Sequence, residues 1–258
     1  MEERVILDQP VTSITYSDQQ VSIVTKNGDK KAGGLQILAD YAICTIPLGV
    51  LQKGDVKFNP PFPPEKREAI NEFEMGNYEK LYVQFPHNFW GNKEVLMSIN
   101  LDRPPTESIM TWGLNLDNEK YFKGSNILSF HSMGSTGRRL ARQDDHSTMK
   151  EVDTNMKRFF GDKAEPPIRI IKTNWTYDPY SYGSWSHMPY GYGKLKWQLV
   201  RKNEGRLYFA GEHTSYNYGF VHSAYQTGQN IAEKIYNSIA GVSLPSLSAR
   251  KFCPSNMY

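Results

Sequence analysis

The feature that most constrains the fold is a short apolar segment followed by a glycine and then by a long segment with helical periodicity. Residues 207–210 are apolar, and Gly211 follows them directly. In residues 221–239, apolar side chains recur at the spacing of one helix face, and Gly241 is placed to end the helix. A buried strand, a sharp turn and a helix form a ligand-binding unit in α/β proteins, with the ligand beyond the carboxyl end of the strand.

Two details of this segment bear on a ligand. Ala224, Gly228 and Ala232 recur every four residues, and such a ridge of small side chains predicts close packing of the helix against a sheet. The first N–H groups of a helix have no intrahelical partner and lie at the positive end of its dipole, which suits an electron-rich ligand edge. Glu212 lies in the turn before the helix, where it either caps the helix or contacts such a ligand.

The rest of the chain alternates between strand and helix signals. A proline-rich break at residues 60–64 indicates the crossing into a second structural unit, and Asn27-Gly28 is a hairpin-turn signal. Residues 35–46 are apolar for long enough to be buried, whereas the tyrosine-rich residues 177–192 show no periodicity and are interpreted as a loop. Helices are predicted at residues 65–73 and 147–160, and strands at residues 11–25 (two strands), 35–46, 78–85, 95–101, 108–116, 126–131 and 168–175.

Composition and charge exclude several classes of protein. With 258 residues, 22% of them charged and 13% aromatic, the chain suits a folded protein with a buried core. The net charge of +3 and the short runs of like charge give no indication of nucleic-acid binding, and we interpret Arg138, Arg139 and Arg142 as a solvated helix face. No apolar stretch approaches the roughly 20 residues of a transmembrane helix.

The two cysteines predict no special chemistry. Cys44 lies in an apolar run and is predicted to be buried. Together with the distant Cys253 it predicts neither a disulfide scaffold nor a metal site. No signal-peptide pattern opens the chain, and the sequence does not identify a cellular compartment.

The residues around Gly211 resemble a known motif. Phe209-Ala210-Gly211-Glu212-His213-Thr214, followed by Gly219-Phe220-Val221-His222-Ser223-Ala224, closely resembles the C-terminal flavin-binding motif of flavin-containing amine oxidases. Three further segments resemble that family in the same order, so that the resemblance covers residues 5–240. They are the strands and following turn within residues 7–51, the strand at 78–86 and the aromatic loop at 175–185. Pro47-Leu48-Gly49-Val50-Leu51 and Val221-His222-Ser223-Ala224-Tyr225 are similar to polyamine oxidases in particular.

The resemblance implies a mixed α/β (α+β) fold. It combines part of a FAD-binding Rossmann-like domain with a substrate domain whose mixed β-sheet is flanked by helices. Residues 1–57 and 200–240 would form portions of the FAD-binding domain, residues 58–199 the substrate domain, and residues 241–258 a tail.

The resemblance also implies FAD as the cofactor and assigns residues to it. Glu212 would bind a ribityl hydroxyl, while Phe220 and Val221 would lie at the flavin, with the helix start facing its pyrimidine edge. Two-electron reduction places negative charge on that edge, and the positive end of a helix stabilises such charge. Val11 would contact the adenine side through its backbone, and Trp175 would pack along the isoalloxazine.

Three residues match the family's catalytic positions. Residues 78–85 alternate so that Lys80 lies opposite the apolar face, and the resemblance implies that Lys80 holds a water against flavin N5. Trp185 and Phe220 match the two rings of an aromatic cage, which favours an approaching amine and lowers its pKa by desolvation. The second ring is often tyrosine in the family, so Phe220 predicts a shifted substrate preference.

The implied reaction is the oxidation of polyamines of the spermine and spermidine class. A hydride passes from a carbon next to a secondary amine to flavin N5, hydrolysis gives an aldehyde and a shorter amine, and dioxygen reoxidises the flavin to give hydrogen peroxide. The implied partners are a small-molecule polyamine and dioxygen, and no metal. The chain shows no Gly-x-Gly-x-x-Gly turn for the FAD pyrophosphate, so we expect it to be inactive by itself.

Several alternatives stay open. The chain is also interpretable as a non-catalytic amine oxidase fragment, or as a monoamine oxidase-like or histone-lysine demethylase-like enzyme, although it leaves no room for the inserted helical tower of the demethylases. The tyrosine-rich loop is typical too of a carbohydrate- or partner-binding β module with exposed rings. From the residues alone, Lys80 can be an ordinary solvent-facing lysine, and Trp185 or Phe220 a core residue.

Overall fold

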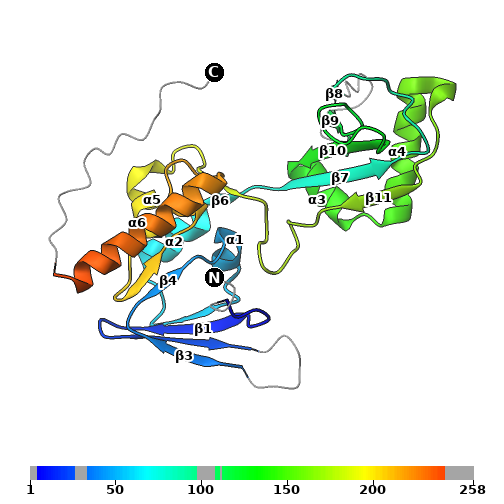
Figure 1. Cartoon of the computed structure of the whole chain (residues 1–258). Helices are drawn as coiled ribbons and strands as arrows, with labels where there is room; N and C mark the ends of the chain where they lie inside the picture. The colour runs from blue at the N-terminus through cyan, green and yellow to red at the C-terminus, as the bar shows by residue number, and fades with distance from the viewer. Residues whose placement is uncertain (1–4, 27–33, 98–107, 111, 242–258) are drawn as a thin grey trace. The chain divides into compact units, whose positions relative to one another are not determined.

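The computed structural model describes residues 5–26, 34–97, 108–110 and 112–241. The chain divides into two compact units, whose elements are labelled in Figure 1. Both units contain helices and strands, which confirms the mixed fold class. Unit 1 comprises Met1–Thr45, Val56–Arg67 and Gly193–Tyr258, and unit 2 comprises Ile46–Asp55 and Glu68–Tyr192.

The larger sheet of unit 1 has the strand order β3-β2-β1-β5. Strands β1 (Val11–Tyr16) and β2 (Val21–Thr25) form an antiparallel hairpin, as their period-two alternation predicts. Strand β3 (Gln36–Ala39) pairs antiparallel with β2 at one edge. Strand β5 (Lys57–Asn59) pairs parallel with β1 at the other edge.

The second sheet of unit 1 leads into the turn at Gly211. It is the parallel pair of β4 (Ala42–Cys44) and β13 (Leu207–Phe209). Ala210 extends the pair, because its N–H donates to the Cys44 carbonyl at 3.0 Å. All three residues of β13 are buried, and so is Cys44, as predicted. The short apolar strand at residues 207–210 is therefore a core element that fixes the start of the turn.

The segment 35–46, expected to be one buried β region, is divided between the two sheets of unit 1. Strand β3 is an edge strand, and its residue Leu38 is exposed. Strand β4 carries the exposed Ile43 beside the buried Cys44. A bend at Asp40 separates the two strands, so an apolar run that suggests one strand forms two short, half-exposed ones.

Helix α6 spans Val221–Ile239, as its periodicity predicts, and Gly241 follows it with φ 66°. Glycine adopts this left-handed conformation without the steric cost of a Cβ, which explains where the helix ends. Among the described residues, no sheet packs closely on the small-residue ridge at Gly228. A Cβ built on Gly228 would meet nothing within 4 Å outside its own helix backbone, in the part of the chain that the structure describes.

The buried face of α6 carries a hydrogen bond to the backbone of Gly211. The buried residues of the helix are Ser223 and Thr227. The Gly211 N–H donates to Thr227 Oγ1 at 2.9 Å, and Thr227 Oγ1 lies 3.2 Å from the Gly211 carbonyl oxygen. The hydroxyl face of α6 is thus turned towards the end of β13, and the apolar positions predicted to pack are left largely exposed.

Unit 2 is built on a five-stranded sheet with the order β11-β7-β10-β9-β8 (Figure 1). All its paired strands are antiparallel, so this sheet differs from the mixed one expected. Helices α3 (Gly134–Arg142) and α4 (Asp145–Phe160) connect β10 to β11. Strand β11 is parallel to β10, but β7 lies between them, so β10 and β11 do not pair. The strands are β7 (Tyr78–Gln84), β8 (Val95–Met97), β9 (Trp112–Asn115), β10 (Ile127–Met133) and β11 (Arg169–Lys172).

Helices α3 and α4 pack on one face of this sheet. The Asp144 carboxylate caps α4 by accepting from the Ser147 N–H at 2.9 Å. The opposite face of the sheet is left to the polar and aromatic residues of β7 and β10. The core between helices and sheet consists of Leu81, Val83, Phe85, Trp90, Ile109, Met110, Leu128, Phe130, Leu140, Val152, Met156 and Ala164.

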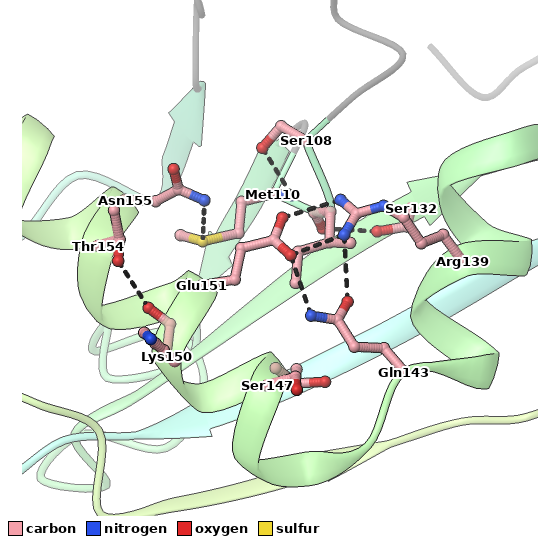
Figure 2. Close-up of polar contacts among 12 residues, drawn as sticks. Ser108, Met110, Ser132, Arg139, Gln143, Ser147, Lys150, Glu151, Thr154 and Asn155 are labelled. Carbon is pink, nitrogen blue, oxygen red and sulfur yellow. Dashed lines mark hydrogen bonds and ion pairs between the residues drawn. The ribbon is translucent and has the colours of Figure 1, made fainter.

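Polar contacts also join α3 to α4, as Figure 2 shows. The Arg139 guanidinium donates to both carboxylate oxygens of Glu151, at 2.7 and 2.8 Å. Gln143 donates to the same carboxylate at 3.1 Å and accepts from Arg139 at 3.2 Å. Burial by itself would raise the pKa of Glu151, but the hydrogen bonds from Arg139 and Gln143 hold it below its ordinary value.

The tyrosine-rich segment 177–192 consists mostly of turns, which confirms its interpretation as a loop. Its one short strand, β12 (Ser186–His187), pairs antiparallel with β6 (Glu74–Met75). Helix α1 (Leu48–Lys53) lies against this loop. A Cβ on Gly49 would lie 2.3 Å from the Ser181 carbonyl oxygen, so the glycine of the Pro-Leu-Gly string permits this approach.

The remaining helices are short. Helix α2 (Pro64–Glu72) begins and ends one residue before its predicted bounds, and its residues belong to both units. Helix α5 (Gly193–Arg201) precedes β13, and the 3-10 helix Gly161–Lys163 follows α4. No helix in the described ranges is long and apolar enough to cross a membrane. The predicted turn at Asn27-Gly28, the end of the strand predicted at 95–101, and the tail beyond residue 241 lie outside the described residues.

Candidate functional site

Strand β7 holds Lys80 on the polar face of the sheet in unit 2. Its residues alternate between half-buried and buried, and Lys80 is half-buried. The Lys80 N–H donates to Thr173 Oγ1 at 2.9 Å, and its carbonyl accepts from the Thr173 N–H at 3.0 Å. Among the described residues, no carboxylate forms an ion pair with the Lys80 ammonium. A half-buried lysine without a counterion is available to bind a ligand or a water.

The preceding residue, Glu79, fixes the start of the aromatic loop. Its carboxylate is completely buried. One oxygen accepts from Thr173 Oγ1 at 2.5 Å and from the Trp175 N–H at 3.2 Å. The other accepts from the Thr176 N–H at 2.9 Å and from Thr176 Oγ1 at 2.7 Å. Because Thr173 also binds the backbone of Lys80, Glu79 links the lysine to the segment that carries Trp175.

Tyr78, the residue before Glu79, contacts Trp185. The ring of Tyr78 lies 5.0 Å from that of Trp185, centroid to centroid. The Trp185 carbonyl accepts from the Gly76 N–H at 2.7 Å. Gly183, with φ 148°, lets the loop come close, because a Cβ there would lie 2.4 Å from Met75 Cγ. Tyr78, Glu79 and Lys80 are thus three consecutive residues that contact Trp185, Trp175 and Thr173.

Both tryptophan side chains remain accessible to a ligand. Trp175 is 48% exposed and Trp185 is 37% exposed, although the backbone of each is held by hydrogen bonds. The interpretation of Trp185 as a core residue is therefore wrong. Rings that are fixed in position but uncovered are suited to contact a flat or cationic ligand.

His131 completes this face of the sheet. It lies opposite Lys80 in the register of β7 and β10, and the Trp112 ring stacks on it with centroids 3.9 Å apart. Its Nδ1 lies 2.6 Å from the Tyr78 hydroxyl, and its Nε2 lies 3.3 Å from Ser129 Oγ. A neutral ring protonated at Nε2 satisfies both contacts. Burial, assisted by the charge of Lys80, lowers the pKa of His131 to about 4, which keeps the ring neutral near pH 7.

Sequence reasoning missed Glu79, Tyr78 and His131. Glu79 lies on the same side of β7 as two apolar residues, and a carboxylate on an apolar face is the signal that could have identified it. No local pattern marks His131, since its contacts with Tyr78 and Trp112 come from other strands.

The lowered pKa of His131 predicts an acid-sensitive contribution to stability. The unfolded chain binds a proton at this histidine near pH 6.5, whereas the folded chain does so only near pH 4. Protons therefore favour unfolding in this interval, and the melting temperature should fall as the pH drops from about 6.5 to about 4.

Replacing His131 by glutamine tests this expectation. We expect the melting temperature of the variant, followed by circular dichroism, to fall less than that of the wild type between pH 7 and pH 4.5. The buried His213, whose pKa burial also lowers to about 4, titrates in both proteins and cancels in the comparison. Parallel curves for the two proteins would contradict the assignment.

In unit 1, the turn after β13 is shaped by glycines and by Glu212. Gly211 has φ 127°, and a Cβ there would lie 2.9 Å from the buried ring of His213. The Glu212 carboxylate accepts from the Gly219 N–H at 2.6 Å. This bond lies just before helix α6, so Glu212 does stabilise the turn into the helix.

Phe220 and Val221 lie at the open start of helix α6. Phe220 is its N-cap residue, and the Phe220 side chain makes no capping hydrogen bond. Phe220 is 57% exposed and Val221 is 88% exposed, so Phe220 is not a core residue. The first N–H groups of a helix have no intrahelical partner and can bind an electron-rich group, which fits the flavin edge expected here.

The other residues assigned to FAD and to the aromatic cage lie on different sheets or in different units. Val11 begins β1 in the larger sheet of unit 1, whereas Glu212 follows the smaller sheet. Trp185 belongs to unit 2 and Phe220 to unit 1, so the cage formed by these two rings stays a prediction.

A family model described as flavin-containing amine oxidoreductase matches residues 1–236. The chain therefore belongs to the flavin-containing amine oxidoreductases. Its cofactor is FAD, as the sequence motifs implied.

Relatives of this chain include a polyamine oxidase and a histone demethylase. Polyamine oxidase 6 from Oryza sativa subsp. japonica is 31% identical over 239 residues, covering 91% of this chain and 46% of that protein. Lysine-specific histone demethylase 2 from Homo sapiens is 28% identical over 235 residues, covering 89% and 28% respectively. The chain thus spans less than half the length of these relatives.

A solved structure shows the same fold. Cyclohexylamine oxidase from Brevibacterium oxydans superimposes with a TM-score of 0.70 at 19% identity, covering 93% of this chain and 50% of the other. At this identity the comparison supports the fold and does not extend to the substrate.

Proposed function

We propose that this chain takes part in the FAD-dependent oxidation of polyamines of the spermine and spermidine class, at a carbon next to a secondary amine. The products are an aldehyde, a shorter amine and hydrogen peroxide, with dioxygen as the oxidant. The observation that carries the proposal is the cluster at the start of β7, where Glu79 and Tyr78 contact Trp175 and Trp185 beside Lys80, whose ammonium forms no ion pair with a described carboxylate. Relatives that are polyamine oxidases support the substrate class.

In this proposal the residues of unit 2 act on the amine and its surroundings. Lys80 holds a water against flavin N5, and Trp175 packs along the isoalloxazine. Trp185 forms one wall of the amine cage and Phe220 of unit 1 the other. Desolvation between aromatic rings favours the neutral amine, which is the form that can be oxidised.

The FAD-binding portion, most of which lies in unit 1, holds the cofactor. Residues 1–57 and 200–240 belong to the FAD-binding portion, and residues 58–199 to the substrate domain. Glu212 binds a ribityl hydroxyl, Val11 contacts the adenine side, and the N–H groups at Val221 face the pyrimidine edge. When bound, FAD supplies the two-electron acceptor for the amine.

The substitution Lys80→Met tests this proposal. It is made in the form of the protein that purifies with FAD, either this chain or a longer product of its gene. Lys80→Met should slow flavin reduction by spermine, or its reoxidation by dioxygen, by about 100-fold, the low end of what a positioned acid–base group or water contributes, because the water that Lys80 holds is lost. Bound FAD, measured by absorbance, should be unchanged. Lys123→Met, which removes an exposed lysine of the same unit, serves as the matched control.

The choice of substrate separates the related activities. Stopped-flow flavin reduction is compared for spermine, spermidine, benzylamine and a methylated histone peptide. Polyamines should give the highest kcat/KM. A preference for the peptide would favour demethylation, and wild-type rates for Lys80→Met in both half-reactions would remove Lys80 from the mechanism.

A further inference from the structure

An arginine-lined groove lies on helix α3 of unit 2. Its volume is about 620 Å³, and it is lined by Ser135, Arg138, Arg139, Arg142 and Gln143. None of these residues has a role in the proposed oxidation. The sequence suggested only a solvated helix face, which describes the charges but does not say how the three guanidinium groups differ.

Arg139 is already neutralised. Its guanidinium is held by both oxygens of Glu151, as Figure 2 shows. One carboxylate engages one guanidinium in this two-bond geometry. Arg139 therefore forms a fixed wall of the groove and is not expected to bind a further anion.

Arg142 is oriented but not neutralised. Its guanidinium lies 4.6 Å from the centroid of the Tyr177 ring. Stacking occupies the flat face of a guanidinium and leaves the N–H groups at its edge free to donate. The position of Arg142 in the last turn of α3 is favourable for a cation, but this interaction does not supply an acceptor for those N–H groups.

Arg138 lies one helical turn before Arg142 on the same face. Helix α3 contains no acidic residue. The nearby acids that follow it are engaged elsewhere: Asp144 caps α4, and Asp145 lies 3.3 Å from Lys172. In the part of the chain that the structure describes, no carboxylate forms an ion pair with Arg138 or Arg142. Two guanidinium groups with unused donors thus line one groove.

We propose that this groove binds a phosphate group through Arg138 and Arg142. A phosphate dianion carries two negative charges and at least three acceptor oxygens, enough to engage two guanidinium groups at once. A carboxylate is matched by one arginine, as Glu151 is by Arg139. The Ser135 hydroxyl is a further donor on the groove wall. The volume leaves room for the group that carries the phosphate.

Calorimetric titration of the full chain tests the site without reference to amine oxidation. The probes are inorganic phosphate and O-phosphoserine, at constant ionic strength set with chloride because the interaction is screened by salt. We expect saturable binding at one site. Arg138→Gln and Arg142→Gln should each weaken it by about tenfold, the loss expected when a charge-assisted hydrogen bond is removed. Tighter binding of O-phosphoserine would identify a phosphate ester, and equal binding would identify free phosphate.

Arg158→Gln is the matched control, because Arg158 is exposed on α4 and does not line the groove. It should bind both probes as the wild type does. Circular dichroism checks that each variant is folded. The proposal is overturned if neither probe binds the wild type, or if Arg158→Gln weakens binding as much as the groove variants do, since that would indicate an unspecific effect of net charge.

Discussion

Replacing Glu79 by leucine should lower the free energy of unfolding by about 3 kcal/mol, because buried donors lose their acceptor. The carboxylate accepts hydrogen bonds from the Trp175 and Thr176 N–H groups and from the hydroxyls of Thr173 and Thr176. The hydroxyls can rotate towards other acceptors, but the two backbone N–H groups cannot. Removing the buried charge offsets part of the loss, so the estimate is smaller than the sum over four bonds.

The effect on the tryptophan should be visible separately from stability. Once its N–H anchor is lost, the segment carrying Trp175 should move more freely and be quenched more readily by acrylamide. Urea unfolding gives the free energy, and quenching below the transition reports the loop. Glu119→Leu is the matched control, since Glu119 is exposed and forms an ion pair with the surface residue Lys123. Equal stability of Glu79→Leu and wild type would show that the carboxylate network is not formed in solution.

Glu79 also shows where prediction from the sequence ended. The alternation of β7 was correctly predicted, because period-two burial is a local property of a strand. The role of Glu79 was not, because its partners lie more than 90 residues further along the chain. A polar residue on the apolar side of a strand indicates a buried acceptor but does not identify the donors.

Helix α6 illustrates the same division. Its bounds follow from local signals, namely its apolar periodicity and the glycine after its end. Which face is buried depends on the bond between Thr227 and Gly211, a tertiary contact that periodicity does not encode. The apolar stripe therefore predicted the helix but not which of its residues are buried.

The candidate site was predictable in part. The motifs identified the family and FAD, and the structure places the exposed Trp175 and Trp185 in one loop, whose first residues donate hydrogen bonds to Glu79 of β7. Local strings could not reveal that Tyr78 and His131 contact each other, since strand pairing brings them together. The pairing of Trp185 with Phe220 stays a prediction.

A second large effect is expected at Lys66, which is only 1% exposed. Its ammonium lies 3.4 Å from Glu204 Oε1 and 3.7 Å from the centroid of the Phe209 ring, and it donates to the Lys202 carbonyl. Lys66→Met should cost about 3 kcal/mol of unfolding free energy near pH 7, since it leaves the carboxylate of Glu204 buried without a cation.

Adding Glu204→Gln to Lys66→Met should recover most of this loss. Replacing a whole buried ion pair by uncharged groups removes two desolvation costs, and such replacements are often neutral or stabilising. Urea unfolding of the single and double variants measures the recovery. A double variant no more stable than Lys66→Met would mean that the lysine contributes through packing against Phe209 and not through the ion pair.

The pH dependence of stability gives an independent test of the buried lysine. Burial lowers the pKa of Lys66 to about 8, against the opposing influence of Glu204 and Cys44 and with a small contribution from the charge of Lys202. Between pH 8 and 10.5 the unfolded lysine is protonated while the folded one is neutral, so unfolding takes up a proton. Stability from this group should therefore rise with pH in that window.

The wild-type free energy of unfolding should thus increase between pH 7.5 and 9.5 relative to that of Lys66→Met. The variant has no ammonium at position 66 to take up a proton on unfolding. The full effect across the window is on the order of 3 kcal/mol, and part of it falls in this range. Measurements stop below pH 10, because burial raises the pKa of Tyr16 to about 12 and ionisation of the unfolded tyrosine then lowers stability. Lys157→Met, which removes an exposed lysine paired with Asp153, should keep the wild-type pH profile. If Lys66→Met keeps it too, the ammonium of Lys66 is solvated in the folded protein and the buried pair is not formed.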